Sequence, residues 1–367
     1  MKKIRIAFVT QFLSVGGIET RLLKLLTHID RTRYDPVLIC ARDDGLGAAR
    51  FKALGIPIVT TRGLLALPRP VQYLELVRLL LRQRLRRFDI LLSFSATSSP
   101  FENALARTAV KSGGYLFGLV INHRMGRDQD WVVREKLAHR IISVSRNSVA
   151  GIFPNQDFGE KLKVIYNGVD LHVFDRTRYP MGRARFSVEK DTFVIGCVAR
   201  LAPQKRYDVL LAALERLKKR NVRFHCLVAG QDRLDGRFQE YVASADLGGN
   251  VTYLGPVSDV PELLAACDVM ALTSDNEGCP NSVLEAMATG IPVVVTRSGA
   301  EEFVVEGKTG FVVPLGDAEA VADRLQVLAD DSALRTRMGA NARQWIAKNA
   351  SLDKMLQEYF LLFAETS

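Results

Sequence analysis

The stretch SDNEGCPNSVLEAMATGIPVVV, residues 274–295, constrains the fold of this chain more than any other. The apolar run DVMALT just before it is typical of a buried parallel strand, and IPVVV starts another such strand. Between the two runs, the spacing predicts a helix over residues 282–289 that begins near Pro280 and ends at Gly290. A strand, a turn, a helix and a second strand in direct succession indicate an α/β fold with a parallel sheet.

Two glutamates in this stretch are presented in different ways. Glu277 lies on the loop ahead of the helix, and Glu285 lies on the first turns of the helix itself. The amides at an uncovered helix start bind anions such as phosphate, and a carboxylate beside an anion is unfavourable unless it accepts hydrogen bonds from hydroxyls. Phosphate on the amides and hydroxyls on the glutamates describe a nucleotide sugar. The alternative is an ordinary helix start whose acidic residues complement the helix dipole.

The string EGCPNSVLEAMATGIPVV, in this strand–loop–helix context, resembles the retaining glycosyltransferases of family GT4. The resemblance covers nearly the whole chain and is densest over residues 163–314. It implies the α/β fold called GT-B, in which two Rossmann-like domains with parallel sheets face each other across a cleft. At 367 residues the chain is also longer than one core usually holds, which separately favours two domains.

The expected domain boundaries follow from the resemblance and from local composition. The run KVIYNGVDLHVF matches the family's interdomain signature, and charge, Pro, Gly and Arg dominate the segment after it, with no apolar period. We expect an N-terminal acceptor-binding Rossmann-like domain, a linker, a C-terminal nucleotide-sugar-binding Rossmann-like domain and a helix that crosses back to the first domain. Their respective residues are 1–175, 176–190, 191–349 and 350–367.

Two cations are expected at the carboxyl end of the first strand of the second domain. Arg200 ends the predicted strand 193–199, and Lys205 stands just before a predicted helix. Two fixed cations and a helix start can neutralise a diphosphate leaving group without a metal. The resemblance implies that role for this pair, although Ala199 and Arg206 replace glycines that are usual in the family. The alternative is a pair of ordinary surface charges.

The first domain offers further candidates at the ends of two predicted strands. Gly16 and Gly17 occupy a strand-to-helix turn where backbone can approach a ligand closely, without forming a GxGxxG dinucleotide fingerprint. Glu19 follows them and either contacts the acceptor or only occupies the first helical turn. His123 ends the predicted strand 115–122, where parallel sheets bind ligands, and the alternative is a surface histidine that begins a loop. Its neighbours Arg124 and Arg127 would hold a charged acceptor.

The resemblance assigns roles to these residues. The catalytic set it implies is Glu277, His123, Arg200 and Lys205. The loop 255–259 resembles the loop that holds the base. The donor-binding residues implied are Gly16, Gly17, Arg200, Lys205, Val257, Gly278, Cys279, Pro280, Asn281, Ser282 and Glu285, and the acceptor-binding residues implied are Glu19, Arg124 and Arg127.

The charge of the chain is divided unevenly. Residues 1–180 contain 29 Lys and Arg against 15 Asp and Glu, whereas the remainder contains 21 against 25. A basic half suggests an anionic partner, and because no nucleic-acid-binding module accompanies it, an acidic acceptor or an anionic membrane surface is favoured over nucleic acid. The predicted helix 73–87 has an arginine-rich face, which is either the solvated side of a helix covering a sheet or a surface that rests on a membrane.

No metal or other cofactor is expected. The five cysteines form no CxxC or His/Cys pattern and are predicted to be reduced. The acidic pairs Asp43-Asp44 and Asp330-Asp331 lack both an intervening residue and flanking ligands. No apolar run reaches the about 18 residues that a membrane span needs, so we expect a cytoplasmic protein, with contact to the inner face of the plasma membrane left open.

The predicted function is retaining glycosyl transfer. The donor is a nucleotide-diphosphate sugar, with UDP favoured over GDP, and the acceptor is a hydroxyl of a glycan or a lipid-linked sugar in bacterial envelope glycan or glycolipid synthesis. The resemblance implies that the leaving phosphate oxygen takes the acceptor's proton. Two alternatives stay open: a nucleotide-sugar epimerase, which needs extra acid and base groups, and a non-catalytic partner subunit of the same fold.

Overall fold

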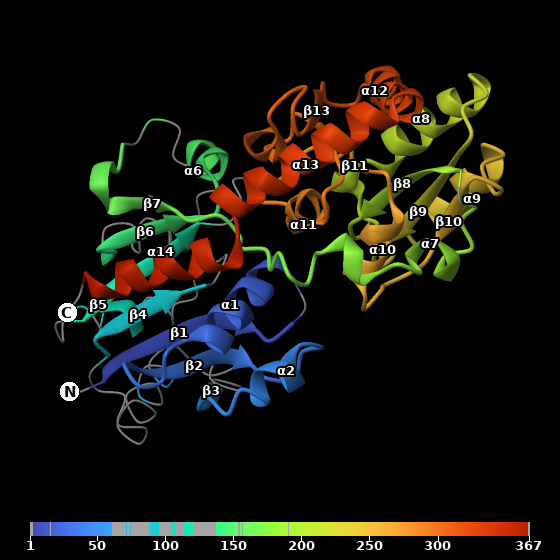
Figure 1. Ribbon diagram of the computed structural model, residues 1–367. Helices are drawn as coiled ribbons and strands as arrows, with labels where there is room; N and C mark the ends of the chain where they lie inside the picture. The colour runs from blue at the N-terminus through green and yellow to red at the C-terminus, as the bar shows by residue number, and fades with distance from the viewer. Residues whose placement is uncertain are drawn as a thin grey trace. The chain divides into compact units, whose positions relative to one another are not determined.

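The computed structural model describes residues 3–14, 16–60, 88–94, 114–120, 137–152, 157–189 and 191–365, together with residues 71, 74, 105–107, 110 and 155 (Figure 1). The chain forms two compact units. Unit 1 contains Met1–Tyr166 and Met355–Ser367, and unit 2 contains Asn167–Lys354.

The described part of unit 1 forms a seven-stranded sheet in the order β3-β2-β1-β4-β5-β6-β7, and each neighbouring pair is parallel. Its strands are β1 (Ile4–Phe12), β2 (Tyr34–Arg42), β3 (Ile58–Thr60), β4 (Ile90–Ser93), β5 (Tyr115–Val120), β6 (Arg140–Ser143) and β7 (Leu162–Val164). Its described helices include α1 (Gly17–His28), α2 (Ala48–Lys52), α6 (Arg146–Ile152) and the 3-10 turn η3 (Gly159–Lys161).

The last helix, α14 (Leu352–Ala364), supplies a large part of the core of unit 1 (Figure 1). Its apolar residues recur at the three- and four-residue spacing of one helical face. The buried ring of Phe363 stacks on Phe117 of β5 with ring centroids 6.4 Å apart, and it lies edge-on to Tyr34 of β2 at 5.8 Å. Burying such aromatic rings stabilises a core strongly, so the sheet of unit 1 depends on the chain's C-terminus.

The described part of unit 2 forms a six-stranded parallel sheet in the order β10-β9-β8-β11-β12-β13. The strands are β8 (Phe193–Val198), β9 (Phe224–Ala229), β10 (Val251–Tyr253), β11 (Val269–Leu272), β12 (Val293–Thr296) and β13 (Gly310–Val313). The helices are α7 (Gly182–Arg185), α8 (Tyr207–Lys219), α9 (Arg237–Ser244), α10 (Val260–Ala266), α11 (Asn281–Thr289), α12 (Ala318–Asp330) and α13 (Ser332–Asn349). Short 3-10 turns are η4 (Arg176–Arg178), η5 (Pro203–Lys205) and η6 (Ala300–Phe303).

Both faces of the unit 2 sheet are covered. Ile195 of β8 packs in one cluster with apolar residues of α8 and α12, which lie side by side (Figure 1). The alternate residue Val194 is equally buried, as is Met270 of β11. Continuous apolar strands are what a parallel sheet with two covered faces requires, which explains why the runs around residues 193–199 and 268–273 predicted buried strands.

The two sheets share one topology, and it is the predicted α/β class with two Rossmann-like parallel sheets. In each sheet the chain moves outward over three strands, returns to the centre and continues on the other side. The order therefore reverses between β1 and β4 in unit 1 and between β8 and β11 in unit 2. Open parallel sheets bind ligands beside the carboxyl ends of the strands at this reversal. Each unit thus has one edge where a site is expected.

The segment from Asn167 onward is built into unit 2, whereas the sequence placed residues 167–175 in the first domain. Val169 donates its amide hydrogen to Ala350 O at 2.9 Å and accepts one from Leu352 N at 2.8 Å. Arg343 of α13 donates to backbone oxygens in residues 171–174. These hydrogen bonds join residues 169–174 to the last part of unit 2, and Val169 and Phe174 are buried as well.

The segment predicted as a linker is folded where the structure describes it, over residues 176–189. It contains η4 and α7, and Arg176 donates to Cys267 O at 3.0 Å. Arg183 pairs with Asp268 at 2.6 Å, and Gly182 packs on the backbone of α10. Polar contacts hold this segment, so it leaves no apolar period in the sequence.

Candidate functional site

The carboxyl ends of β8 and β11 bring Lys205 and Glu277 together. The two strands are neighbours in the sheet, and each residue lies on the loop that follows its strand. Lys205 Nζ lies 2.5 Å from Glu277 Oε1, and the side chains are only 12% and 10% exposed. A largely buried ion pair therefore occupies the point in unit 2 where the strand order reverses.

Backbone hydrogen bonds fix the two loops to each other. Thr273 Oγ1 donates to the carbonyl oxygens of Lys205 at 3.1 Å and Arg206 at 3.0 Å. Asp275 N donates to Gln204 O at 2.9 Å. Thr273 and Asp275 therefore join the loop of Glu277 to the loop of Lys205 beside the ion pair.

A third loop, after β12, holds Glu277 from the other side. Glu277 N donates to Ser298 O at 2.6 Å. Gly299 has φ +105, and a Cβ added there would lie 2.1 Å from Glu277 O. Only glycine fits such a close approach in that conformation. The loop after β12 therefore includes a glycine that lets it approach the backbone of Glu277 closely.

Arg206 keeps the backbone geometry that glycine would favour at this position. Its φ and ψ are +49 and +52, in the left-handed region. Its guanidinium pairs with Asp208 at 2.8 Å and with Asp275 at 3.0 Å. The hydrogen bond to Asp208 is the main reason that the pKa of Arg206 is raised, with Asp275 adding to it. The substitution noted in the sequence thus preserves the turn and adds a link to the loop that carries Glu277.

Arg200 follows β8 directly and has a different environment from Lys205. Its side chain is exposed, and it makes no ion pair or side-chain hydrogen bond with any residue that the structure describes. The carbonyl of Ala199 before it meets Gly230, where an added Cβ would lie 1.9 Å away. The backbone under Arg200 is therefore closely packed while its cation is available to a ligand.

The start of α11 lies next to Glu277 in the chain. Pro280 is the N-cap residue and supplies no side-chain hydrogen bond, and Gly290 ends the helix in the left-handed conformation predicted for it. Asn167 Nδ2 donates to Cys279 O at 3.2 Å and to Asn281 Oδ1 at 2.8 Å. Asn167 was not among the predicted site residues, although it lies within KVIYNGVDLHVF, whose match to the family signature is the one signal that could have marked it.

The remaining donor candidates of unit 2 lie along the same edge of the sheet. Gly278 is buried beside Glu277, and Ser282 and Glu285 are half-buried on α11. Val257 is half-buried on the loop after β10, and that loop joins the one after β9 through Gly230 N donating to Gly255 O at 2.9 Å. The loops after β8, β10 and β11, together with α11, thus carry every residue that the sequence assigned to the donor in this unit.

In unit 1 the candidates that the structure describes are at the start of α1. Gly16 is the N-cap residue in an extended conformation, with φ −157, and Gly17 begins the helix. Glu19 Oε1 accepts a hydrogen bond from Ser14 Oγ at 2.9 Å, so its carboxylate folds back on the helix start. The candidates His123, Arg124 and Arg127, and almost all of the predicted helix 73–87, lie outside the described residues.

Cys40 and Cys267 are buried, and one residue of each acidic pair makes a structural contact. Burial raises the pKa of Cys40 and Cys267 to about 12, which disfavours the reactive thiolate. Asp43 pairs with Lys52 at 3.3 Å. Asp331 accepts a hydrogen bond from Leu334 N and so caps α13. Among the described residues, no helix is long and apolar enough to cross a membrane.

Solved structures share this architecture over nearly the whole chain, and they define its class as the GT-B fold. The Anabaena protein HepE in complex with UDP superposes with a TM-score of 0.84 at 22% identity, covering 99% of this chain and 100% of that one. The apo lipopolysaccharide outer core galactosyltransferase WaaB superposes with a TM-score of 0.76 at 18% identity, covering 99% and 100%.

Family models identify the chain more narrowly. Residues 15–173 match the model for Glycosyltransferase Family 4, and residues 182–345 match the model for Glycosyl transferases group 1. The chain therefore belongs to the GT4 family of glycosyltransferases, as the motif around Glu277 predicted.

Relatives with named functions include the following two proteins. N-acetyl-alpha-D-glucosaminyl L-malate synthase of Bacillus anthracis is 26% identical over 65% of this chain and 61% of its own length. The lipopolysaccharide core biosynthesis glycosyltransferase LpsE of Rhizobium meliloti is 30% identical over 50% of this chain and 53% of its own length. The chain thus spans only about half to three-fifths of the length of these relatives.

Proposed function

We propose that this protein is a retaining glycosyltransferase that moves a hexosyl or N-acetylhexosaminyl group from a nucleotide-diphosphate sugar to a hydroxyl acceptor. The observation that carries the proposal is the buried pair of Lys205 and Glu277, set beside the α11 start and the exposed Arg200. UDP is the favoured nucleotide, in keeping with the UDP named in the HepE complex. The names of relatives in lipopolysaccharide core and capsular polysaccharide biosynthesis support an envelope glycan as the acceptor.

The leaving group of this reaction is a nucleoside diphosphate, on which negative charge grows as the bond to the sugar breaks. Arg200 and Lys205 supply two positive charges, and the first amides of α11 supply hydrogen-bond donors. Fixed donors aimed at developing charge lower the barrier because they need no rearrangement during the reaction. We propose that this set replaces a metal ion, so that the reaction requires no cofactor.

Glu277 and Glu285 would orient the donor through its hydroxyls. Glu277 accepts from Lys205 in the structure, and its second carboxylate oxygen would accept from sugar hydroxyls. Glu285, eight residues along the chain on α11, would accept from the ribose hydroxyls. His123 would contact the sugar from the first domain, as the family resemblance implies.

The proton from the acceptor hydroxyl would pass to the leaving phosphate oxygen. Attack on the same face as the departing diphosphate retains the configuration of the sugar, and the oxygen that leaves is the nearest base. This arrangement demands no protein base, and Glu277 then acts by positioning. The mechanism is carried over from the family.

Thermal unfolding with UDP, GDP and ADP, each with and without EDTA, tests the donor site. We expect UDP to raise the midpoint temperature of unfolding more than GDP or ADP does. EDTA should leave that increase unchanged, and Arg200→Ala should abolish it. Lys219→Ala is the matched control, because Lys219 is an exposed cation on the same unit far along α8. If no nucleotide stabilises the protein, the donor site is misassigned.

Turnover separates an enzyme from a non-catalytic subunit. UDP-sugars are incubated with the protein and a lipid-linked or soluble glycan acceptor, and released UDP and the anomeric configuration of the product are measured. UDP release that requires acceptor, with retained configuration, supports the proposal. Stabilisation by UDP without any release, across hexose and N-acetylhexosamine donors, would favour the partner-subunit alternative.

A further inference from the structure

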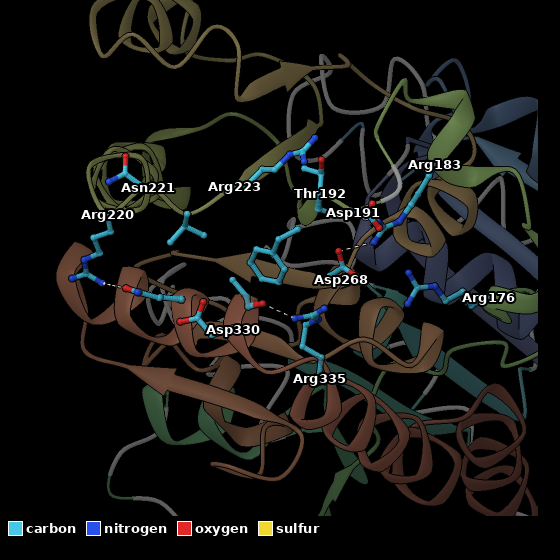
Figure 2. A pocket seen from close by; sticks show the side chains of 14 residues that line it. Arg176, Arg183, Asp191, Thr192, Arg220, Asn221, Arg223, Asp268, Asp330 and Arg335 are labelled. Atoms are coloured by element: carbon cyan, nitrogen blue, oxygen red, sulfur yellow. Dashed lines mark hydrogen bonds and ion pairs between the residues drawn. The ribbon is translucent and has the colours of Figure 1, made fainter.

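Unit 2 has a cavity at the edge of its sheet opposite the candidate donor site (Figure 2). Its volume is about 740 Å³, which is within the range of sites for small organic molecules. Phe193 at the start of β8, Arg223 just before β9 and Asp268 just before β11 form one wall. The end of α12 and the first turn of α13 form another. The cavity therefore lies at the amino ends of the strands.

Three arginines of this cavity surround one carboxylate. Figure 2 shows the side chains of Arg176, Arg183 and Arg335 gathered near Asp268. Arg183 Nη2 lies 2.6 Å from Asp268 Oδ2, and that same oxygen accepts from Val194 N at 2.8 Å. Asp268 is thus already engaged by one guanidinium and one backbone amide.

The other two arginines bond only to neutral groups. Arg176 Nη2 donates to Cys267 O at 3.0 Å. Arg335 Nη1 donates to Ala329 O at 3.0 Å and to Leu328 O, and its guanidinium lies 5.4 Å from the centre of the Phe193 ring. Neither arginine forms an ion pair with any residue in the described part of the chain. Each also keeps further N–H groups that a ligand can use, since a guanidinium has five.

The cations at the inner end of the cavity are close enough to influence one another. Burial lowers the pKa of Arg176, and the charges of Arg183 and Arg335 lower it further, while Asp268 opposes them. Toward the rim, Arg220 pairs with Asp323 at 2.8 Å. Arg220 and Arg223 of the lining are therefore paired with carboxylates, whereas Arg176 and Arg335 form no ion pair within the described part of the chain; the carboxylates of Asp191 and Asp330 also line the cavity.

We propose that this cavity binds the phosphate group of a phosphorylated small molecule. The planar guanidiniums of Arg176 and Arg335 match the oxygens of a phosphate, which can accept two parallel hydrogen bonds from each. Phe193 holds Arg335 in place from one side through its ring face. A phosphate alone would occupy a small part of the volume, so the ligand carries an organic body. A free phosphoester and a phospholipid headgroup share this chemistry.

This site is separate from the donor site, although the same two strands lead to both. β8 and β11 run from Phe193 and Asp268 to the loops of Lys205 and Glu277. Six residues of strand span about 20 Å. Both sites would attract phosphate, so the experiment must remove one before it measures the other.

Pyrophosphate binding, measured by titration calorimetry at low salt, is the first test. The variant Arg200→Ala/Lys205→Met/Glu277→Leu removes the two donor-site cations without leaving Glu277 buried and unpaired, and we expect it still to bind pyrophosphate. Adding Arg335→Gln should weaken that binding about tenfold or more, because one charged hydrogen-bonding group is lost. Binding that disappears with the donor-site cations alone would overturn the proposal.

Arg335 also caps the end of α12, so its removal can disturb folding. A second variant, Ala329→Glu, adds a carboxylate to the cavity lining without removing a hydrogen bond. Ala329→Gln is its matched neutral control. We expect Ala329→Glu to weaken pyrophosphate binding about tenfold or more and Ala329→Gln to leave it unchanged, with circular dichroism identical for both. Equal binding by the two variants would overturn the proposal.

Vesicles identify the source of the phosphate. Co-sedimentation uses phosphatidylglycerol vesicles, with phosphatidylcholine vesicles as the neutral comparison. Binding to phosphatidylglycerol that Ala329→Glu weakens and Ala329→Gln does not assigns a lipid headgroup. If the two variants differ in pyrophosphate binding by calorimetry but bind phosphatidylglycerol vesicles equally, the ligand is a free phosphoester. If neither pyrophosphate nor phosphatidylglycerol binding depends on residue 329, no phosphate site exists here.

Discussion

The two units share one sheet topology but carry opposite chemistry at corresponding loops. After β1 in unit 1, the loop presents Gly16 and Gly17, and the carboxylate of Glu19 is bound by a serine hydroxyl. After β8 in unit 2, the equivalent loop presents Arg200 and Lys205, and Lys205 is paired with a buried glutamate from the neighbouring strand's loop. The strand order decides where a site can lie, and the loop sequence decides what it can bind.

The two loops also differ in their contacts. The loop after β8 is hydrogen-bonded to the loop after β11, and Ala199 O on it meets Gly230 of the loop after β9. In unit 1 the loop after β1 is held by Gly47 N, which donates to Leu13 O at 3.0 Å, and the helix start has the local contact between Ser14 and Glu19. A preorganised set of charges suits the tight binding of a diphosphate, and this is why we place the donor in unit 2.

The largest effect is expected from Lys205→Met. It leaves Glu277 buried without its partner, which should cost about 3–5 kcal/mol of unfolding free energy. It should also lower kcat/KM for glycosyl transfer at least about 100-fold, because a donor to the leaving group is lost. Urea unfolding and initial rates measure the two effects.

The double variant Lys205→Met/Glu277→Leu is the control for that experiment. Removing both charges should restore most of the stability, since well-packed apolar groups replace a buried ion pair at little cost. Activity should stay absent. If Lys205→Met alone is as stable as the wild type, the ion pair is solvated, and leaving Glu277 without its partner costs no unfolding free energy.

Two glycines, one from each unit, give the next comparison. Gly299→Ala should cost about 3 kcal/mol, because its φ is +105 and the new Cβ would strike the carbonyl of Glu277. Gly16→Ala should change the free energy of unfolding by no more than about 0.5 kcal/mol. The φ of Gly16 is −157, and the group nearest to the new Cβ is the movable carboxylate of Glu19. Equal costs in denaturant unfolding would contradict the view that Gly299 faces fixed backbone whereas Gly16 faces a movable side chain.

Arg206 provides a smaller and sharper test of the unit 2 loop. Arg206→Ala loses the contacts to Asp208 and Asp275 and keeps the left-handed strain, so it should cost about 1–2 kcal/mol. Arg206→Gly loses the same contacts but relieves the strain, so it should be about 1 kcal/mol more stable than the alanine variant. If glycine and alanine behave alike, the strain at residue 206 is negligible and the ion pairs alone account for the arginine.

Much of this fold could be predicted because its signals are local. The helix predicted over residues 282–289 is observed as Asn281–Thr289 with Gly290 in the left-handed conformation, since glycine at a helix end is a strong stop signal. Apolar runs marked the buried strands of both sheets. By contrast, α10 was missed although Asp259 caps it and Pro261 lies in its first turn, because the preceding loop had been interpreted only as a base-binding segment.

The contacts that make the site were less predictable. Lys205 and Glu277 are 72 residues apart, and their pairing depends on β8 lying next to β11 in the sheet. Asn167 reaches the start of α11 across more than 100 residues of chain. The segment over residues 176–189 folds through hydrogen bonds from arginines to backbone oxygens. The spacing of residues in the sequence does not predict such long-range polar contacts.

The smallest effect is expected in unit 1, where the sequence left two roles open for Glu19. As a local contact of the α1 start, Glu19→Gln should cost about 0.5 kcal/mol, because the amide oxygen still accepts from Ser14 while the charge at the helix start is lost. Ser14→Ala, which removes the donor, should match it. If Glu19 instead contacts the acceptor, Glu19→Gln raises the acceptor KM while Ser14→Ala leaves it unchanged. Measuring both variants by unfolding and by acceptor titration decides whether unit 1 contributes this carboxylate to its own helix or to the reaction.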